Sequence, residues 1–140
     1  MSHLLDTSVI TRVSHAKPDV LIALEALRRS IGGANIARCA MTDLEYGFSA
    51  ENERQWDLRS SDLSVYKFVD VESVDVRVAL HLQRELAKAG LAKRKVPDLV
   101  IAAVAINHGL TLVHYDADFV LIATVSALKH EWIVARGSTD

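Results

Sequence analysis

Five acidic residues occupy positions at which the sequence could support chemistry: Asp6, Glu45, Asp98, Asp116 and Asp118. Asp6 follows the apolar pair Leu4-Leu5, so it lies where a short strand is predicted to run into a helix. Asp116 follows the apolar run 111–113 in the same way. Viewed alone, each acid has a structural explanation as a helix cap, a first-turn charge or a turn former. Their chemistry therefore depends on whether the fold brings them together.

Asp98 gives the strongest indication that it does. The eight residues that follow it, 99–106, are all apolar, so the helix that Asp98 begins should be buried on nearly every side. A carboxylate at such a position is costly unless a proton or a cation neutralises it. Gathered carboxylates also repel one another, which either raises their pKa values or favours a bound cation. A set of oxygen ligands without cysteine or paired histidines suits Mg²⁺ or Mn²⁺ better than zinc.

Strands and helices are predicted to alternate along the whole chain. The predicted strands are residues 4–5, 36–40, 66–71, 111–113 and 132–134. The predicted helices begin near residues 9, 18, 42, 51, 74, 98 and 118, and the sequence 42–45 has the spacing of a capping box, with Glu45 as its acid. This alternation predicts an α/β fold with a mainly parallel sheet between helices. Ligands of such sheets bind beyond the carboxyl ends of the strands, where Asp6 and Asp116 both lie.

The composition is that of one globular domain. The chain has 140 residues, of which 50% are hydrophobic and 24% are charged, and its formal net charge is -2. We expect a single domain over residues 1–135 and a loose tail over 136–140. With this net charge, nucleic-acid binding requires a local basic patch, and the candidates are Arg28-Arg29 and the connector 93–95.

Cellular location is predicted from what the sequence lacks. The single cysteine, Cys39, excludes an internal disulfide and lies in an apolar run, so we expect it to be buried and inert. The first residues lack the pattern of a signal peptide. The most apolar run is far shorter than the roughly 18 to 20 residues that cross a bilayer. These features predict a cytoplasmic protein without a membrane partner.

Four segments resemble one known family in order and spacing: LLDTSV at 4–9, MTDLEYG at 41–47, PDLVIAA at 97–103 and HGLTLVHYDADF at 108–119. They are similar to the PIN-domain nucleases and, more closely, to the VapC toxins of bacterial toxin–antitoxin pairs. The resemblance implies a three-layer sandwich with helices on both faces of the sheet. It places the family's acidic quartet on Asp6, Glu45, Asp98 and Asp116, with Asp118 as a further acid. It also implies that Mg²⁺ or Mn²⁺ is held chiefly by Asp6, Asp98 and Asp116.

The same resemblance implies an endoribonuclease toxin that arrests growth by cleaving RNA of the translation machinery. It also implies a VapB-like antitoxin on the apolar groove of the early helices, and a homodimer. Water would attack phosphorus in line. Glu45 or Asp116 would orient that water, and Thr7 or Ser8 would support a ligand carboxylate. His114 departs from the small hydroxyl residue that family members often have, so it could alter hydrogen bonds around Asp116.

Three alternatives remain open at this point. A PIN nuclease that processes RNA outside any toxin system would share the chemistry and differ in causing no growth arrest. A non-catalytic module would bind metal or a basic partner without cleaving RNA. A phosphatase of the haloacid-dehalogenase type also begins with a strand and an aspartate, but it needs a second aspartate where this chain has Ser8.

Overall fold

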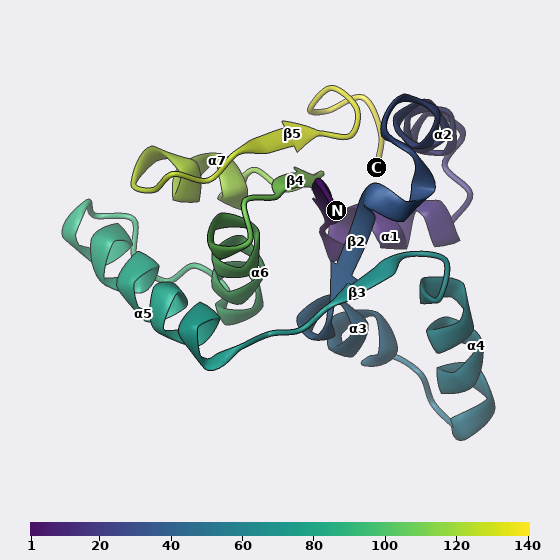
Figure 1. Cartoon of the computed structure of the whole chain (residues 1–140), viewed down its shortest axis with the longest axis horizontal. Helices are drawn as coiled ribbons and strands as arrows, with labels where there is room; N and C mark the ends of the chain where they lie inside the picture. Colours follow the sequence, from purple (N-terminus) through teal and green to yellow (C-terminus); the bar gives the residue numbers. More distant parts are fainter.

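The computed structural model describes residues 1–140 and has a sheet of five strands at its centre (Figure 1). The strands are β1 (His3–Leu5), β2 (Ile36–Cys39), β3 (Lys67–Val69), β4 (Thr111–His114) and β5 (His130–Trp132). They lie in the order β3-β2-β1-β4-β5, and every neighbouring pair is parallel. The sheet that the sequence predicted as mainly parallel is therefore entirely parallel.

Seven α-helices connect and cover these strands: α1 (Thr7–Ser14), α2 (Pro18–Ile31), α3 (Ala40–Gly47), α4 (Glu53–Leu63), α5 (Ser73–Lys88), α6 (Val96–Asn107) and α7 (Asp118–Thr124). A short 3₁₀ turn, η1 (Gly33–Asn35), precedes β2. Pro18 is the first residue of α2, where its missing N–H costs nothing. Gly32 ends that helix at a φ of 85°, a conformation that favours glycine.

The sheet has helices on both faces because successive strand residues point to opposite sides. Leu4 and Leu112 belong to a core with α5, α6 and α7. Their neighbours Leu5 and Val113 belong to a second core with α1 and α2. In Figure 1 these two groups of helices lie on opposite sides of the sheet. The three-layer arrangement predicted from the resemblance is thus confirmed.

The chain reverses its direction of winding at β1. It places β2 and β3 on one side of β1, and later β4 and β5 on the other side. The segments that leave β1 and β4 therefore emerge side by side at the carboxyl edge of the sheet. Such a reversal point opens a crevice in parallel sheets, and Asp6 and Asp116 follow these two strands.

The predicted elements are present, and one strand was misplaced. The long helices α2, α5 and α6 begin within two residues of their predicted starts. The last strand was predicted at residues 132–134 and forms instead at His130–Trp132. Its position is set by register, since Leu112 pairs with His130 and His114 pairs with Trp132. Cys39 is buried as predicted.

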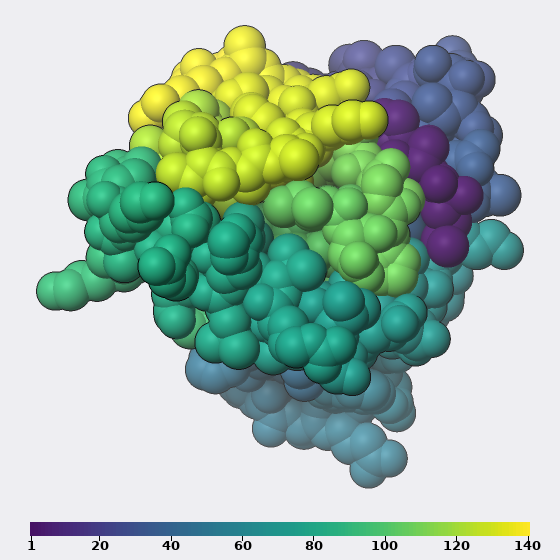
Figure 2. All heavy atoms as spheres, turned by 60° about the vertical axis from the view of Figure 1, so that its left-hand side comes forward, coloured from purple at the N-terminus to yellow at the C-terminus, as the bar shows by residue number.

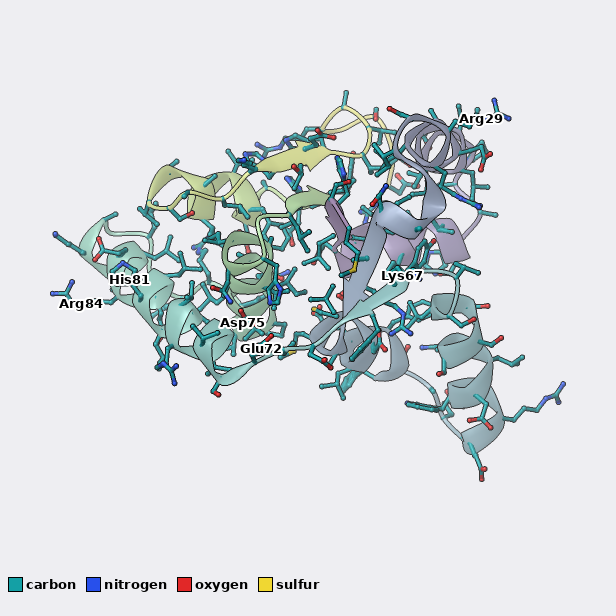
Figure 3. The ribbon with its side chains drawn as sticks, in the orientation of Figure 1. Arg29, Lys67, Glu72, Asp75, His81 and Arg84 are labelled. Carbon is teal, nitrogen blue, oxygen red and sulfur yellow. The ribbon has the colours of Figure 1, made fainter.

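A buried carboxylate that the sequence analysis did not single out joins α5 to α6. Asp75 is fully buried in the first turn of α5, and the N–H of Glu72 donates to its Oδ2 at 2.8 Å. Nδ2 of Asn107 donates to Oδ1 at 2.8 Å, and Nε2 of His108 lies 3.3 Å from Oδ2. Figure 3 shows Asp75 and Glu72 at the end of α5 that adjoins α6. These bonds hold the C-terminal end of the helix whose first turn contains Asp98.

The C-terminal residues lie against the segment after β4. The hydroxyl of Tyr115 donates to the carbonyl oxygen of Thr139 at 2.8 Å and accepts from the N–H groups of Gly137 and Thr139 at 2.8 and 3.2 Å. In the space-filling view of Figure 2 the last residues, in yellow, pack along the green part of the molecule. The looseness of residues 136–140 stays a prediction.

None of the seven helices has both the length and the apolar composition that crossing a membrane requires.

Candidate active site

Asp6 is held at the junction of β1 and α1 by bonds on both sides. Its N–H donates to the carbonyl oxygen of Val113 on β4 at 2.9 Å, and its Oδ2 accepts from the N–H of Ser8 at 3.0 Å. The second bond makes Asp6 the N-cap of α1, as the sequence allowed. Its side chain does more than cap, however, because Oδ1 is buried and has no hydrogen-bond partner.

Asp98 is the third residue of α6 and is only 3% exposed. Its Oδ2 is also buried without a hydrogen-bond partner. The nearest cation is the ammonium of Lys95, with Nζ 3.7 Å from that oxygen. Leaving a buried polar group unsatisfied typically costs about 1–3 kcal/mol, and more for a charged one. The first turn of α6 therefore presents a carboxylate whose environment favours a proton or a cation.

The turn between β4 and α7 contributes two further carboxylates. The N–H of Asp118 donates to Oδ1 of Asp116 at 2.9 Å, which fixes the two side chains relative to each other. One carboxylate oxygen each from Asp98, Asp116 and Asp118 lie within 4.8 Å of one another. The structure thus groups Asp118 with Asp98 and Asp116. Asp6 is close enough for its charge to act on Asp98.

Glu45 reaches the same region from α3, but not as the sequence predicted. The capping box over residues 42–45 is wrong, because α3 begins at Ala40 and Thr42 is buried inside its first turn. Glu45 is therefore too far along the helix to cap it. Instead its Oε1 accepts a hydrogen bond of 2.6 Å from Oγ1 of Thr7 on α1. Support of a site carboxylate by Thr7 had been expected, and Glu45 is the carboxylate that receives it.

The environment of the cluster raises the pKa of two of its acids. Burial, with the charges of Glu45 and Asp116, raises the pKa of Asp6 to about 6, against the lowering effect of its bonds with Ser8. Burial and the charge of Asp6 raise the pKa of Asp98 to about 7, although Lys95 lowers it. Without a cation, part of the cluster therefore holds protons near neutral pH. Perturbed acids of this kind are typical of functional sites.

The basic connector 93–95 lies beside the cluster, a contact that the sequence could not show. Nζ of Lys95 lies 3.1 Å from Oδ2 of Asp116, and Nη1 of Arg94 lies 3.0 Å from Oδ1 of Asp118. Lys95 is 62% exposed, so its ammonium is accessible from solvent while it partly neutralises the acids. The other candidate patch, Arg28-Arg29, lies on α2, where both side chains pair with Glu25.

His114 contacts the cluster through the backbone of Asp116. The N–H of Asp116 donates to its Nδ1 at 3.1 Å, and its Nε2 lies 2.9 Å from Nδ1 of His130. The ring is fully buried among Phe119, His130 and Trp132. Burial and the neighbouring His130 lower the pKa of His114 to about 4. The neutral ring is therefore a fixed acceptor beneath Asp116, and His130 is a residue that sequence reasoning missed.

The donor set of this site fits a hard divalent cation. All the candidate ligand atoms are carboxylate oxygens, the type that Mg²⁺ and Mn²⁺ prefer. Two of these oxygens, Oδ1 of Asp6 and Oδ2 of Asp98, are buried without a hydrogen-bond partner in the chain. A cation beside Asp98, Asp116 and Asp118 would offset the two effects that raise the pKa of Asp98, which are chiefly its burial and then the neighbouring negative charges.

Comparison with known sequences finds one matching family. The family model of the PIN domain matches residues 3–125. The chain is 45% identical to Ribonuclease VapC51 of Mycobacterium tuberculosis over 140 residues, which cover 100% of this chain and 98% of that protein. It is 41% identical to Ribonuclease VapC21 of the same species over 106 residues, covering 74% of this chain and 76% of the relative.

Solved structures share the fold at lower sequence identity. A VapBC complex from Salmonella typhimurium bound to DNA matches with a TM-score of 0.76 at 18% identity, covering 96% of this chain and 99% of that one. VapBC-1 from nontypeable Haemophilus influenzae matches with a TM-score of 0.75 at 19% identity, covering 95% and 98%. Together, the family match and the full-length relative show that this chain belongs to the PIN-domain family, among its VapC-type members.

Proposed function

We propose that this protein is an endoribonuclease that depends on Mg²⁺ or Mn²⁺ and acts as the toxin of a type II toxin–antitoxin pair. The observation that carries the proposal is that Asp6 and Asp98, at the reversal point of the sheet near Asp116, each have a buried carboxylate oxygen without a hydrogen-bond partner. The relatives at 45% and 41% identity are named ribonucleases, which supports RNA as the substrate.

Asp6, Asp98 and Asp116 would hold the cation, with Asp118 beside them. When bound, the cation would neutralise the negative charge that develops on the phosphoryl oxygens. Glu45 orients the attacking water and accepts its proton, because its carboxylate lies beside the cluster and is fixed in place by the hydroxyl of Thr7. His114 keeps the backbone of Asp116 in place from below.

Lys95 and Arg94 help to bring a polyanion to an acidic site. Both cations lie within 3.1 Å of cluster acids, and Lys95 is accessible to solvent. Once a divalent cation neutralises the acids, these side chains become available to phosphate oxygens of the RNA. We also propose that the protein forms a homodimer. Because Arg94 and Lys95 lie beside the cluster in the same chain, the site does not depend on the second protomer for positive charge.

An apolar groove suits the proposed antitoxin. It has a volume of about 220 Å³, and six of its nine lining residues are hydrophobic, among them Val13, Leu21 and Leu24 of α1 and α2. Amphipathic helices bind such grooves through apolar side chains. The solved VapBC complexes share the fold of this chain, which supports a VapB-like partner.

The first experiment is cleavage of RNA by the purified protein with Mn²⁺, with EDTA, and as the variants Asp98→Asn and Asp6→Asn. We expect cleavage only by the wild type with metal and by the control Asp70→Asn, whose exposed side chain lies outside the cluster. Equal cleavage by all variants would overturn the proposal. Growth arrest on expression, relieved by a co-expressed antitoxin, separates a toxin from an RNA-processing nuclease. Metal binding without RNA cleavage would indicate a non-catalytic module.

A further inference from the structure

A polar hollow adjoins the acidic cluster and has no part in holding the cation. It has a volume of about 360 Å³ and is lined by α1, α3 and α4: Thr11, Ser14, His15, Glu45, Tyr46, Ser49, Arg59 and Asp62. Only Tyr46 among these is hydrophobic. Glu45 belongs to both the hollow and the acidic cluster, since it lines the hollow and its charge acts on Asp6 and Asp98. A ligand in the hollow would therefore lie directly beside the proposed site of cleavage.

The chemistry of the lining suits a nucleobase better than a phosphate. Two carboxylates, Glu45 and Asp62, outnumber the single guanidinium of Arg59, so the hollow does not attract an anion. Its volume is within the roughly 300–1,000 Å³ of small-molecule sites. Proteins that read RNA sequence commonly bind unstacked bases through hydrogen bonds to their edges and through planar side chains. Tyr46 and Arg59 supply such planes, with Cζ of Arg59 5.7 Å from the ring centroid.

The hydrogen-bonding groups of the hollow are held in place and only partly used. Oδ2 of Asp62 accepts from the hydroxyl of Tyr46 at 3.1 Å. Nη1 of Arg59 donates to the carbonyl oxygen of Tyr46 at 2.9 Å and to Oγ of Ser49. These bonds leave Oδ1 of Asp62 and the second lone pair of its Oδ2 as acceptors, and Nη2 of Arg59 as a donor. An acceptor and a donor therefore remain side by side in one small hollow.

We propose that this hollow binds an unstacked guanine base of the RNA next to the cleaved phosphate, read by Asp62 and Arg59. Guanine carries two adjacent N–H donors, on N1 and N2, that one carboxylate can accept together, and its O6 accepts from a guanidinium. The neighbouring groove at α1 and α2 has the opposite character, because most of its lining is apolar. That contrast assigns the apolar groove to a protein helix and the polar hollow to the substrate. The inference rests on the ribonuclease activity proposed above.

The test is sequencing of the fragments that the purified protein produces from a randomised RNA oligonucleotide with Mn²⁺. We expect guanine to be enriched at one position fixed relative to the cut. Asp62→Asn should reduce that enrichment at least fivefold, because Asn offers an N–H where guanine needs an acceptor. Asp57→Asn is the matched control, since Asp57 lies on the same helix but lines a different hollow. A profile without guanine enrichment, or one that Asp62→Asn leaves unchanged, would overturn the proposal.

A second measurement distinguishes failure of this site from failure of the ribonuclease proposal. Guanosine 5′-monophosphate is titrated into the ¹⁵N-labelled protein, with cytidine 5′-monophosphate as the comparison. We expect guanosine to shift the amide signals of Tyr46, Ser49 and Asp62, and to do so weakly or not at all in Asp62→Asn. This result can be obtained even from a protein that cleaves no RNA. Weaker antitoxin binding by Asp62→Asn with an unchanged fragment profile would instead assign the hollow to the protein partner and overturn the inference.

Discussion

The backbone N–H of Asp116 donates to Nδ1 of His114 at 3.1 Å, so a buried imidazole fixes the turn from which two of the site carboxylates project. Because Nδ1 accepts this bond, the ring proton is on Nε2 and is donated to Nδ1 of His130 at 2.9 Å. The low pKa of His114, about 4, keeps the ring in this neutral form at physiological pH. We infer that His114 is a positioning residue for Asp116 and Asp118.

Two variants of nearly equal shape test this role. His114→Asn offers an amide oxygen where Nδ1 accepts the Asp116 bond, whereas His114→Leu offers none. Both lose packing against Phe119 and Trp132, so both should lower the melting temperature. Mn²⁺ affinity by calorimetry should fall by about 10- to 100-fold in the leucine variant and largely recover in the asparagine variant. Equal affinities in the two variants would show that His114 has only a packing role.

The raised pKa values of Asp98 and Asp6 predict how metal-free stability depends on pH. The folded chain holds protons up to about pH 7 on Asp98 and about pH 6 on Asp6, whereas the unfolded chain loses them near the ordinary aspartate pKa of 3.8. The folded state thus binds more protons in this window, and the free energy of unfolding decreases from these groups as pH rises through it. Asp98→Asn removes the larger contribution.

Thermal melts in EDTA at pH 5 and pH 8 measure this effect. Asp98→Asn should melt several degrees above the wild type at pH 8 and close to it at pH 5, because the wild-type carboxyl is protonated at the lower pH. The difference between the two proteins cancels the titration of the groups that do not interact with Asp98. A variant that is less stable than the wild type at pH 8 would contradict the raised pKa.

Protons should compete with the cation for the same oxygens. Since the pKa of Asp98 is about 7, its carboxylate is mostly protonated at pH 6 and mostly ionised at pH 8. Mn²⁺ affinity should therefore weaken by about tenfold between pH 8 and pH 6 if one proton is displaced. Calorimetry in buffers of different ionisation enthalpy also counts the protons released. A pH-independent affinity would show that the cation binds without Asp98.

The acids at strand ends were predictable because their positions follow from local rules. A short apolar run followed by Asp6, and another followed by Asp116, must bring both carboxylates to one edge of a parallel sheet. The all-apolar helix after Asp98 likewise required that this carboxylate be buried, and it is 3% exposed. In each case the residues adjacent in the sequence were enough to predict where the carboxylate lies.

The other contacts of the site were not predictable because they join residues far apart in the chain. The bond between Thr7 and Glu45 spans 38 residues, and the local pattern favoured a capping box instead. Lys95 and Asp116 are 21 residues apart, and the basic run alone did not indicate which surface it meets. His114 and His130 meet only because β4 and β5 pair in a register that strand propensities do not specify.

Lys95 is expected to affect the two proposed ligands in opposite directions. Its ammonium lies 3.1 Å from Asp116 and 3.7 Å from Asp98, so a divalent cation must compete with it for these oxygens. Removing the ammonium in Lys95→Met should therefore strengthen Mn²⁺ binding. The same change removes a positively charged side chain that would contact the RNA, so RNA affinity should fall. The salt dependence of that affinity should decrease by the equivalent of about one phosphate contact.

Lys93→Met is the control, because Lys93 belongs to the same connector, is exposed and makes no ion pair with the cluster. Mn²⁺ affinity is measured by calorimetry, and RNA affinity is measured at several salt concentrations in the Asp98→Asn background, where no cleavage is expected. Asp98→Asn leaves the pair with Asp116 intact, so Lys95 keeps a partner there. A loss of both affinities in Lys95→Met would make Lys95 a structural support of the cluster. Stronger Mn²⁺ binding with weaker RNA binding would show that the Lys95 ammonium neutralises the acids in the metal-free protein and contacts an RNA phosphate in the complex.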